Sequence, residues 1–252
     1  MKTRLMLTDR TWGKLEYALR RAGARITKGT RKIVEAILWR LRTGAPWRDL
    51  PPIFGPASTV WGRYIRWCKS GVMREVFVTL RGALDLEWCA WDSSYIKAHQ
   101  HAHGARRGRI VDLGRSRGGS STKIHAATDS NGNLIDFKLS PGNTHDIKMA
   151  DDLLSMCEGA EAILADKAYD SEAVRKDIAQ SNAQVVIPFR TTTKKGRDAG
   201  FDKDQYRLRH LAENLFCRMK QFRAVATRYE KTSTSYGGAV YLAGTMDWLR
   251  VA

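Results

Sequence analysis

Residues 88–92 read WCAWD and residues 162–166 read AILAD, and these two short runs decide the fold class. Each is a run of apolar residues that suits a strand buried on both faces of a sheet, and each ends in an aspartate, Asp92 or Asp166. Carboxylates that follow neighbouring strands of an α/β sheet meet at one edge, where ligand and catalytic sites of such sheets lie. The two runs therefore predict a central sheet with an acidic site at its edge.

The segments around these runs alternate between strand and helix patterns. Ser130-Asn131-Gly132-Asn133 is a strong turn signal and predicts a hairpin. The Gly- and Arg-rich segment 104–120 is expected to be a mobile loop. Strands mixed with helices predict an α/β domain with a mixed sheet flanked by helices. Further strands are expected at residues 123–129, 134–140 and 184–189, and helices at residues 145–157, 171–182, 204–223 and 235–250.

The first part of the chain has only helical patterns, at residues 8–22, 29–43 and 57–70. In the third helix Thr59, Arg63 and Arg66 share a face, because they are spaced at i, i+4 and i+7. A short helix, a turn and a basic helix form the layout of a helix-turn-helix, whose second helix enters the major groove of DNA. A helical bundle with a solvated basic face is the alternative.

Positive charge is concentrated in the same N-terminal part. The chain of 252 residues has a formal net charge of +17, and its pI is about 10.0. Residues 1–84 hold 18 Lys or Arg against 5 Asp or Glu, whereas the remainder holds 25 against 21. This excess favours a polyanionic partner, nucleic acid before membrane. We therefore predict a DNA-binding domain at residues 1–84 and a more balanced domain at residues 85–252.

Several other classes of protein are not expected. The four cysteines form no C-x-x-C pair, which favours reduced thiols over a zinc site. The alternating His99, His101 and His103 are more typical of a solvated face than of a metal site. No apolar stretch matches a signal peptide or a spanning helix, so a soluble cytosolic protein is expected.

Residues 204–223, DQYRLRHLAENLFCRMKQFR, supply a third acid. In one continuous helix Tyr206, Arg209, Glu213 and Lys220 would fall within roughly 60° of one another. Glu213 could then join Asp92 and Asp166 as a ligand of Mg²⁺, which would relieve the repulsion between the carboxylates. Arg209 and Lys220 could meet phosphates, although a solvated face with an Arg–Glu pair is the alternative. The apolar face of this helix would consist of Leu208, Leu211, Ala212, Leu215, Met219 and Phe222.

The same helix carries the pattern Y-(2)-R-(3)-E-(6)-K, which resembles the signature of bacterial insertion-sequence DDE transposases. The surrounding sequence is similar to the Insertion Sequence Five family of these enzymes in particular. The similarity runs from the N-terminal region almost to the end of the chain. The blocks that carry it are LRTGAPWRDLP at 41–51, WDSSYIKAH at 91–99, GRSRGGSSTKIHAATDSNG at 114–132, LSPGNTHD at 139–146, LADKAYDS at 164–171 and YRLRHLAENLFCRMKQFRAVATRYEK at 206–231.

This resemblance implies an RNase H-like catalytic domain behind a small all-α helix-turn-helix-like domain. It implies Asp92, Asp166 and Glu213 as the catalytic and metal-binding triad, with two Mg²⁺ ions that Mn²⁺ can replace. The implied partners are double-stranded DNA, as terminal inverted repeats and target DNA, and further copies of the chain in a homodimer or higher oligomer. The implied location is the bacterial cytoplasm, at the nucleoid. The expected DNA contacts are Thr59, Arg63, Arg66, Lys69, Lys97, Arg115, Arg117, Lys123, Tyr206, Arg209 and Lys220.

Two residues depart from the pattern of the family. Ala168 stands where Gly is usual, and Ser94 where Thr is frequent. Neither change removes an acid, so we expect at most an altered activity. Two other functions stay open at this point: an RNase H-like nuclease or resolvase that cuts without joining, and a DNA-binding regulator with a decayed catalytic domain.

Overall fold

The chain folds into two compact units of different secondary structure. The computed structural model describes residues 4–105, 111–116, 118–190 and 202–250. Within these ranges, no helix has both the length and the apolar character needed to cross a membrane. We call the units the sheet unit, residues 83–96 and 113–217, and the helical unit, residues 1–82, 97–112 and 218–252.

The sheet unit contains a mixed sheet. Strand β1 is parallel to β5, β5 is parallel to β6, and β3 lies beside β1 and pairs antiparallel with both β2 and β4. This arrangement, with helices on both faces, confirms the predicted RNase H-like fold class. The strands are β1 Cys89–Ala98, β2 Gly114–Ser116, β3 Gly119–Thr128, β4 Leu134–Pro141, β5 Ala162–Leu164 and β6 Gln184–Val186, and the helices are α5 Ala150–Met156, α6 Glu172–Gln180, α7 Lys203–Arg207 and α8 His210–Met219, with short 3-10 turns at Asp146–Met149 and Lys167–Tyr169.

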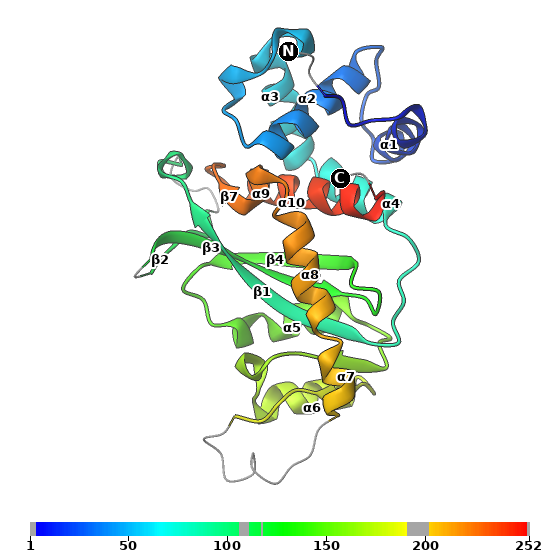
Figure 1. Ribbon diagram of the computed structural model, residues 1–252, viewed down its shortest axis with the longest axis vertical. Helices are drawn as coiled ribbons and strands as arrows, with labels where there is room; N and C mark the ends of the chain where they lie inside the picture. The colour runs from blue at the N-terminus through cyan, green and yellow to red at the C-terminus, as the bar shows by residue number, and fades with distance from the viewer. Residues whose placement is uncertain (1–3, 106–110, 117, 191–201, 251–252) are drawn as a thin grey trace. The chain divides into compact units, whose positions relative to one another are not determined.

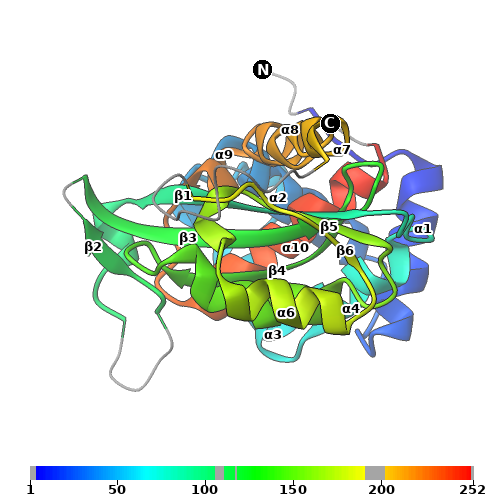
Figure 2. The same cartoon turned by 90° about the horizontal axis from the view of Figure 1, so that it is seen from below.

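Helices cover both faces of this sheet, as Figure 2 shows for α8 on one side and α6 on the other. On the α8 face, Trp88, Ala90 and Leu164 pack with Ala212 of α8. The other face holds a larger apolar cluster that includes Trp91 and residues of α5 and α6. Because both faces are buried, β1 and β5 begin as unbroken apolar runs instead of alternating patterns.

The turn between β3 and β4 ties the sheet to α8. The Asp129 carboxylate accepts hydrogen bonds from the backbone N–H groups of Asn131, at 3.1 Å, and Asn133, at 2.8 Å. Gly132 has a φ of 71°, and a Cβ there would lie 2.9 Å from the Cβ of Leu211. The turn therefore needs glycine for two reasons, its backbone conformation and the close approach of α8. The predicted hairpin is confirmed, and Asp129 has a structural role within it.

One predicted element is wrong in part, because a strand lies inside the segment expected to be a loop. Residues 114–116 form β2, which pairs with residues 119–121 of β3. The glycines of this segment concealed the strand, since glycine is depleted in β-strands. Residues 106–110 and 117 of the same segment lie outside the described ranges.

The long helix expected at residues 204–223 is divided into α7 and α8. At Leu208 and Arg209 the backbone N–H groups bond three residues back, to Gln205 and Tyr206, instead of four. The tighter turn shifts the faces of the two helices relative to a continuous one, and Leu208 is left exposed. Helix α8 ends at Met219, so Lys220 lies beyond it.

The helical unit contains helices from the N-terminal and the C-terminal parts of the chain. Helix α10 packs against α3 and α4 of the N-terminal part, and α9 packs against α2 (Figure 1). Helix α4 was not predicted. The helices are α1 Asp9–Arg21, α2 Thr30–Thr43, α3 Ala57–Lys69, α4 Val72–Leu80, α9 Arg223–Ala226 and α10 Ser233–Trp248, with short 3-10 turns at Trp47–Asp49, Pro52–Phe54 and Gln100–Ala102 and a strand β7 at Thr227–Arg228.

The two compact units do not coincide with the division at residue 84, which stays a prediction about the domains. Residues 97–105 and 218–250, which we predicted from the sequence to belong to the second domain, lie in the same compact unit as the N-terminal helices. The physical reason is α10, which is buried around most of its circumference, as at Tyr236, Val240 and Met246. A helix that is apolar on all sides must be enclosed by other elements. Helices α3 and α4 provide part of that enclosure.

Candidate active site

The two aspartates lie at the same level of neighbouring parallel strands. Ala90 of β1 pairs with Leu164 of β5, so Asp92 and Asp166 each follow that pair by two residues. Strand β1 continues through Asp92 to Ala98, which corrects the expectation that Asp92 ends its strand. Ala90 packs on the α8 face, and the alternation of a strand turns Asp92 to the same face.

Asp166 follows β5 and caps the short turn after it. Its Oδ1 accepts a hydrogen bond from the backbone N–H of Ala168 at 2.8 Å. This contact uses only the backbone of residue 168. The alanine that stands there in place of the usual glycine therefore leaves the contact in place.

Helix α8 brings the third acid to this face of the sheet. Glu213 follows Ala212, which packs on the strands, and forms an ion pair with Arg209. Arg209 also lies 3.4 Å from an Asp92 carboxylate oxygen, and the Tyr206 ring centroid is 5.8 Å from its guanidinium. Both interpretations of this helix hold in part. The Arg–Glu pair exists, and the Glu213 side chain is 54% exposed, but the Arg209 side chain is only 17% exposed and is turned towards Asp92.

The charges at this site perturb one another. The pKa of Asp92 is raised from 3.8 to about 6, chiefly by burial; the Arg209 guanidinium opposes this rise, and the nearby charges of Glu213 and Asp166 add to it. All three acids are therefore close enough to interact electrostatically. Clusters of this kind, in which burial and like charge both act on one carboxylate, are typical of functional sites.

The acids fit a divalent cation by their chemistry, but Arg209 holds two of them. Carboxylate oxygens are the ligands that Mg²⁺ prefers in proteins. Within the described ranges, no three or more His, Cys, Asp or Glu side chains are arranged closely enough to hold a metal ion. Arg209 pairs with Asp92 and Glu213, and Asp166 is turned to the backbone of its own turn. The guanidinium thus supplies the positive charge that balances the cluster.

Four of the expected DNA contacts lie on α3. The side chains of Thr59, Arg66 and Lys69 are exposed. Arg63 is half-buried, donates a hydrogen bond to the carbonyl oxygen of Arg25 at 3.2 Å, and lies 5.6 Å from the Trp67 ring centroid. The helix predicted at residues 57–70 is confirmed as α3, and of its two arginines Arg66 is the exposed one.

The remaining expected contacts are scattered. Lys97 and Arg115 are exposed, at the end of β1 and on β2, and Lys220 is exposed beyond α8. Arg117 lies outside the described residues. The prediction from the sequence grouped these cations together as DNA contacts. In the structure Lys97 and Lys220 belong to the helical unit and Arg115 to the sheet unit.

The expectation that Lys123 contacts DNA is corrected by its surroundings. Its ammonium group donates to the Asp146 carboxylate and to the Thr144 carbonyl oxygen, both at 2.9 Å, and lies 4.3 Å from the Tyr95 ring centroid. The residue is only 1% exposed. Its charge is satisfied inside the sheet unit, so it is not available to a phosphate.

His125 lies on the same strand, and its lowered pKa predicts how the free energy of unfolding depends on pH. The ring is buried, its Nε2 lies 2.8 Å from the Ser140 hydroxyl, and burial lowers its pKa from 6.5 to about 4. Between these values the unfolded chain binds more protons than the folded one, so stability falls as the pH drops from about 6.5 to about 4. The full loss is about 3 kcal/mol.

This loss can be measured by urea unfolding at several pH values. We expect His125→Gln to lose about 2–3 kcal/mol less than the parent protein over that range, and the exposed His103→Gln to follow the parent protein. An unchanged pH profile in His125→Gln would show that another group causes the acid sensitivity.

A buried ion pair in the helical unit was not predicted from the sequence. Nη1 of Arg40 lies 2.7 Å from Oε1 of Glu230, and both side chains are nearly inaccessible to solvent. The signal available was an arginine among the buried residues of α2, three positions after Ile37 and one before Leu41. A charge at such a position needs a partner of opposite charge, which local sequence cannot identify.

Comparison with known proteins places this arrangement in a family. Residues 86–243 match the family "Transposase DDE domain", and residues 7–77 match "Putative transposase of IS4/5 family". A "Putative transposase for insertion sequence element IS6501" from Brucella ovis is 36% identical over 130 residues, which is 52% of this chain and 99% of that protein. The "Uncharacterized protein y4sN" from Sinorhizobium fredii is 46% identical over 79 residues, which is 31% of this chain and 63% of that protein.

Among solved structures, the chain is similar to the crystal structure of a pre-cleavage Mos1 transpososome. The sequence identity is 13%, the TM-score is 0.28, and the match covers 90% of this chain and 79% of that one. The family match over residues 86–243 spans both aspartates and the glutamate of the acidic cluster. The chain therefore belongs to the DDE transposases, and its N-terminal part to the IS4/5 type.

Proposed function

We propose that this transposase cuts DNA at the terminal inverted repeats of an insertion sequence and joins the free 3′ ends to target DNA. The observation that carries the proposal is the electrostatic cluster of Asp92, Asp166 and Glu213, which two parallel strands and α8 bring to one face of the sheet. In this proposal the three acids are the catalytic residues.

The cofactor that fits these acids is Mg²⁺, with Mn²⁺ as a substitute. Asp92, Asp166 and Glu213 would together hold the two ions. When bound, such ions activate the attacking hydroxyl group and stabilise the leaving oxygen of a phosphodiester. Arg209 must release Asp92 and Glu213 for these residues to act as ligands, and it can then contact the phosphate beside the cut.

The substrate in this proposal is double-stranded DNA, bound by a homodimer or a higher oligomer. The net charge of +17 supports a polyanionic partner. The exposed side chains of Thr59, Arg66 and Lys69 on α3 support the helical unit as the part that recognises the terminal repeats. Helices α1–α4 at residues 9–80, as one all-α domain, would carry this recognition.

A strand-transfer assay tests the proposal most directly. The protein is incubated with Mg²⁺, a duplex that ends in the DNA flanking its own gene, and a supercoiled target plasmid. Joined products that require the specific end support a transposase. Cleavage without joining would indicate a nuclease or resolvase, and binding without Mg²⁺-dependent chemistry would indicate a regulator.

Arg66→Ala tests the assignment of α3. We expect a loss of about 1–3 kcal/mol in binding to the terminal repeat if Arg66 contacts a base edge. If it contacts only a phosphate, affinity should fall for all sequences, and the slope of log affinity against log salt should flatten by about 0.9. Gel-shift titrations at several salt concentrations separate these results. Arg20→Ala, an exposed arginine of α1, is the matched control, and unchanged binding by Arg66→Ala would exclude α3 as the recognition helix.

A further inference from the structure

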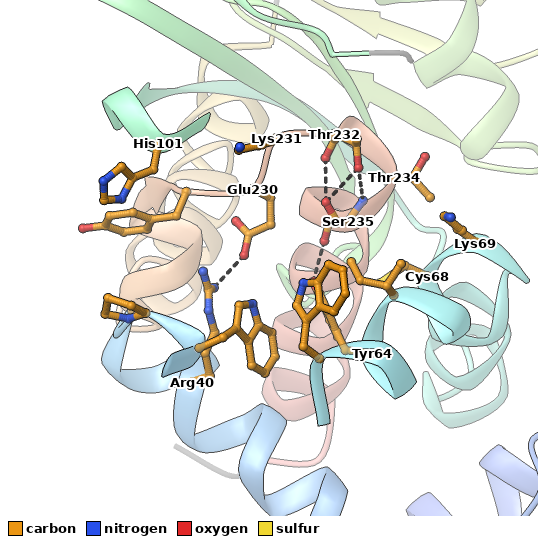
Figure 3. Close-up of a pocket in the computed structure, with 16 residues that line it drawn as sticks. Arg40, Tyr64, Cys68, Lys69, His101, Glu230, Lys231, Thr232, Thr234 and Ser235 are labelled. Atoms are coloured by element: carbon orange, nitrogen blue, oxygen red, sulfur yellow. Dashed lines mark hydrogen bonds and ion pairs between the residues drawn. The ribbon is translucent and has the colours of Figure 1, made fainter. Parts of the chain in front are cut away.

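The helical unit contains a cavity of about 600 Å³ that the acidic site does not use. It lies between α2, α3 and the segment from Tyr229 to Ser235, as Figure 3 shows. The volume falls in the range of about 300–1,000 Å³ that is typical of pockets for small ligands and cofactors.

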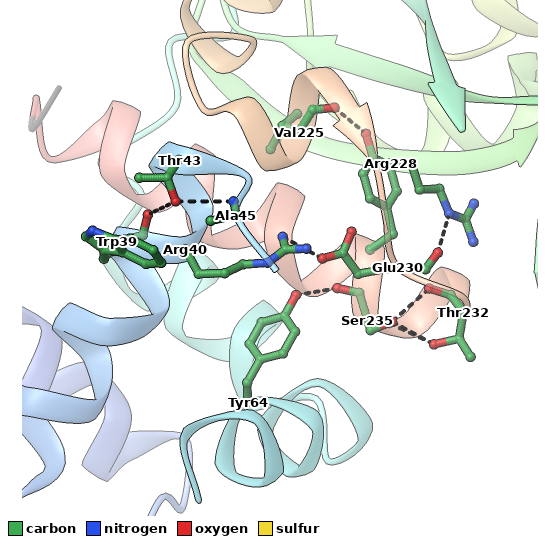
Figure 4. Close-up of polar contacts among 11 residues, drawn as sticks. Trp39, Arg40, Thr43, Ala45, Tyr64, Val225, Arg228, Glu230, Thr232 and Ser235 are labelled. Atoms are coloured by element: carbon green, nitrogen blue, oxygen red, sulfur yellow. Dashed lines mark hydrogen bonds and ion pairs between the residues drawn. The ribbon is translucent and has the colours of Figure 1, made fainter. Parts of the chain in front are cut away.

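The floor of this cavity is the buried pair of Arg40 and Glu230 (Figure 4). Burial raises the pKa of Glu230, while the Arg40 guanidinium lowers it. The backbone N–H groups of Tyr229 and Glu230 also favour the charged form, but no described residue donates a hydrogen bond of normal geometry to either carboxylate oxygen. Buried polar atoms are nearly always hydrogen-bonded, so this carboxylate has acceptor capacity for a ligand.

The walls of the cavity are aromatic. Trp61 of α3 is 48% exposed, which is unusual for so large an apolar side chain, and it lines the cavity. Trp47 is held in place by the Tyr64 ring, with 5.3 Å between the ring centroids, and by the Arg40 guanidinium, 5.4 Å from its own centroid. These indole rings offer flat surfaces to a planar ligand.

The rim of the cavity is cationic. Lys69 of α3 and Lys231 line it, together with the hydroxyl-bearing Thr232 and Thr234. An aliphatic ligand would form no ion pair with these cations, and a small inorganic anion would not stack on the indole rings. Aromatic surfaces beside lysines and a buried acceptor match a nucleotide, which has a planar base with N–H groups and a charged phosphate.

We propose that this pocket binds one unpaired nucleotide of the DNA substrate. The base stacks on Trp61, an N–H group of the base donates to the Glu230 carboxylate, and the adjacent phosphates contact Lys69 and Lys231. This inference rests on the proposed function in one respect, namely that DNA is the partner. It adds a site that recognises distorted or frayed DNA to the helical unit.

The experiment compares two duplexes of the same sequence in binding to the full chain. One carries an extrahelical 2-aminopurine, and in the other the same base is paired with thymine. We expect the protein to prefer the first duplex and to quench its fluorescence, because 2-aminopurine stacks on an indole ring. Trp61→Ala should weaken binding of the first duplex by about 5- to 150-fold, leave the second unchanged, and remove the quenching.

Two more variants complete the test. Glu230→Gln should also lower the preference for the unpaired base, and Tyr17→Ala, an exposed aromatic residue of α1 outside the pocket, should leave it unchanged. Thermal unfolding shows whether each variant is folded; Trp61 is exposed, so its result stands even if Glu230→Gln does not fold. Equal binding of both duplexes, unaffected by Trp61→Ala, would overturn the pocket but leave DNA as the partner. Failure to bind either duplex would overturn the proposed function itself.

Discussion

Asp92→Asn, Asp166→Asn and Glu213→Gln should each lower DNA cleavage and strand transfer at least about a thousand-fold, while binding to terminal-repeat DNA stays within about twofold. A carboxamide keeps the shape of the acid but removes the charge that would hold a divalent cation, and such cations contribute several kcal/mol to phosphoryl transfer. Binding depends on cations elsewhere, such as the exposed Arg66 and Lys69. Cleavage assays and gel shifts on the same preparations measure the two effects.

The raised pKa of Asp92 also predicts the stability of its variant, so thermal unfolding can separate a loss of chemistry from misfolding. Burial raises this pKa to about 6, so the ionised carboxylate opposes folding above that pH. Asp92→Asn should therefore unfold at the same temperature as the parent protein or a higher one at pH 7.5. Asp204→Asn, which changes an exposed acid of α7, is the matched control. Normal strand transfer by any one of the three variants would refute the assignment of the triad.

Arg209→Ala should reduce strand transfer roughly a hundredfold, a loss similar to that for one donor removed from an active site. Arg209 forms ion pairs with two of the three acids, Asp92 and Glu213. Arg207→Ala should change the rate less than about threefold, because Arg207 is 80% exposed and its ion pair with Asp204 is an exposed one. Binding to uncut repeat DNA should change little in either variant.

The pKa of Asp92 provides a second measurement that does not depend on activity. Arg209 lowers this pKa, so Arg209→Ala should move it above about 6, and Arg207→Ala should not. Carboxyl carbon NMR over a pH series can follow the titration in the absence of divalent cations. Equal effects of the two substitutions on the transfer rate, or no shift of the Asp92 titration, would show that Arg209 does not serve the acidic site.

Local patterns in the sequence were sufficient to predict most of the sheet unit. The apolar runs before Asp92 and Asp166, the turn at residues 130–133 and the i, i+4 spacing of Arg209 and Glu213 each depend on neighbours within a few residues. A strand, a tight turn and a helical ion pair are set by such short-range geometry. The fold class, and the three acids as candidate site residues, could therefore be predicted before any contact was known.

Only the tertiary structure decided which side chains are available for function. Lys123 and Arg66 are both cations in the sequence, but Lys123 is buried against Asp146 whereas Arg66 is exposed. The pairing of Arg40 with Glu230 joins residues 190 positions apart, and it forms the floor of a pocket that no local pattern reveals. The packing of residues 218–250 with the N-terminal helices also depends on contacts between segments that are far apart in the sequence. Burial and long-range pairing depend on how distant segments pack. Periodicity along the chain indicates which face of an element is apolar, but it does not identify the distant residues that pack against that face.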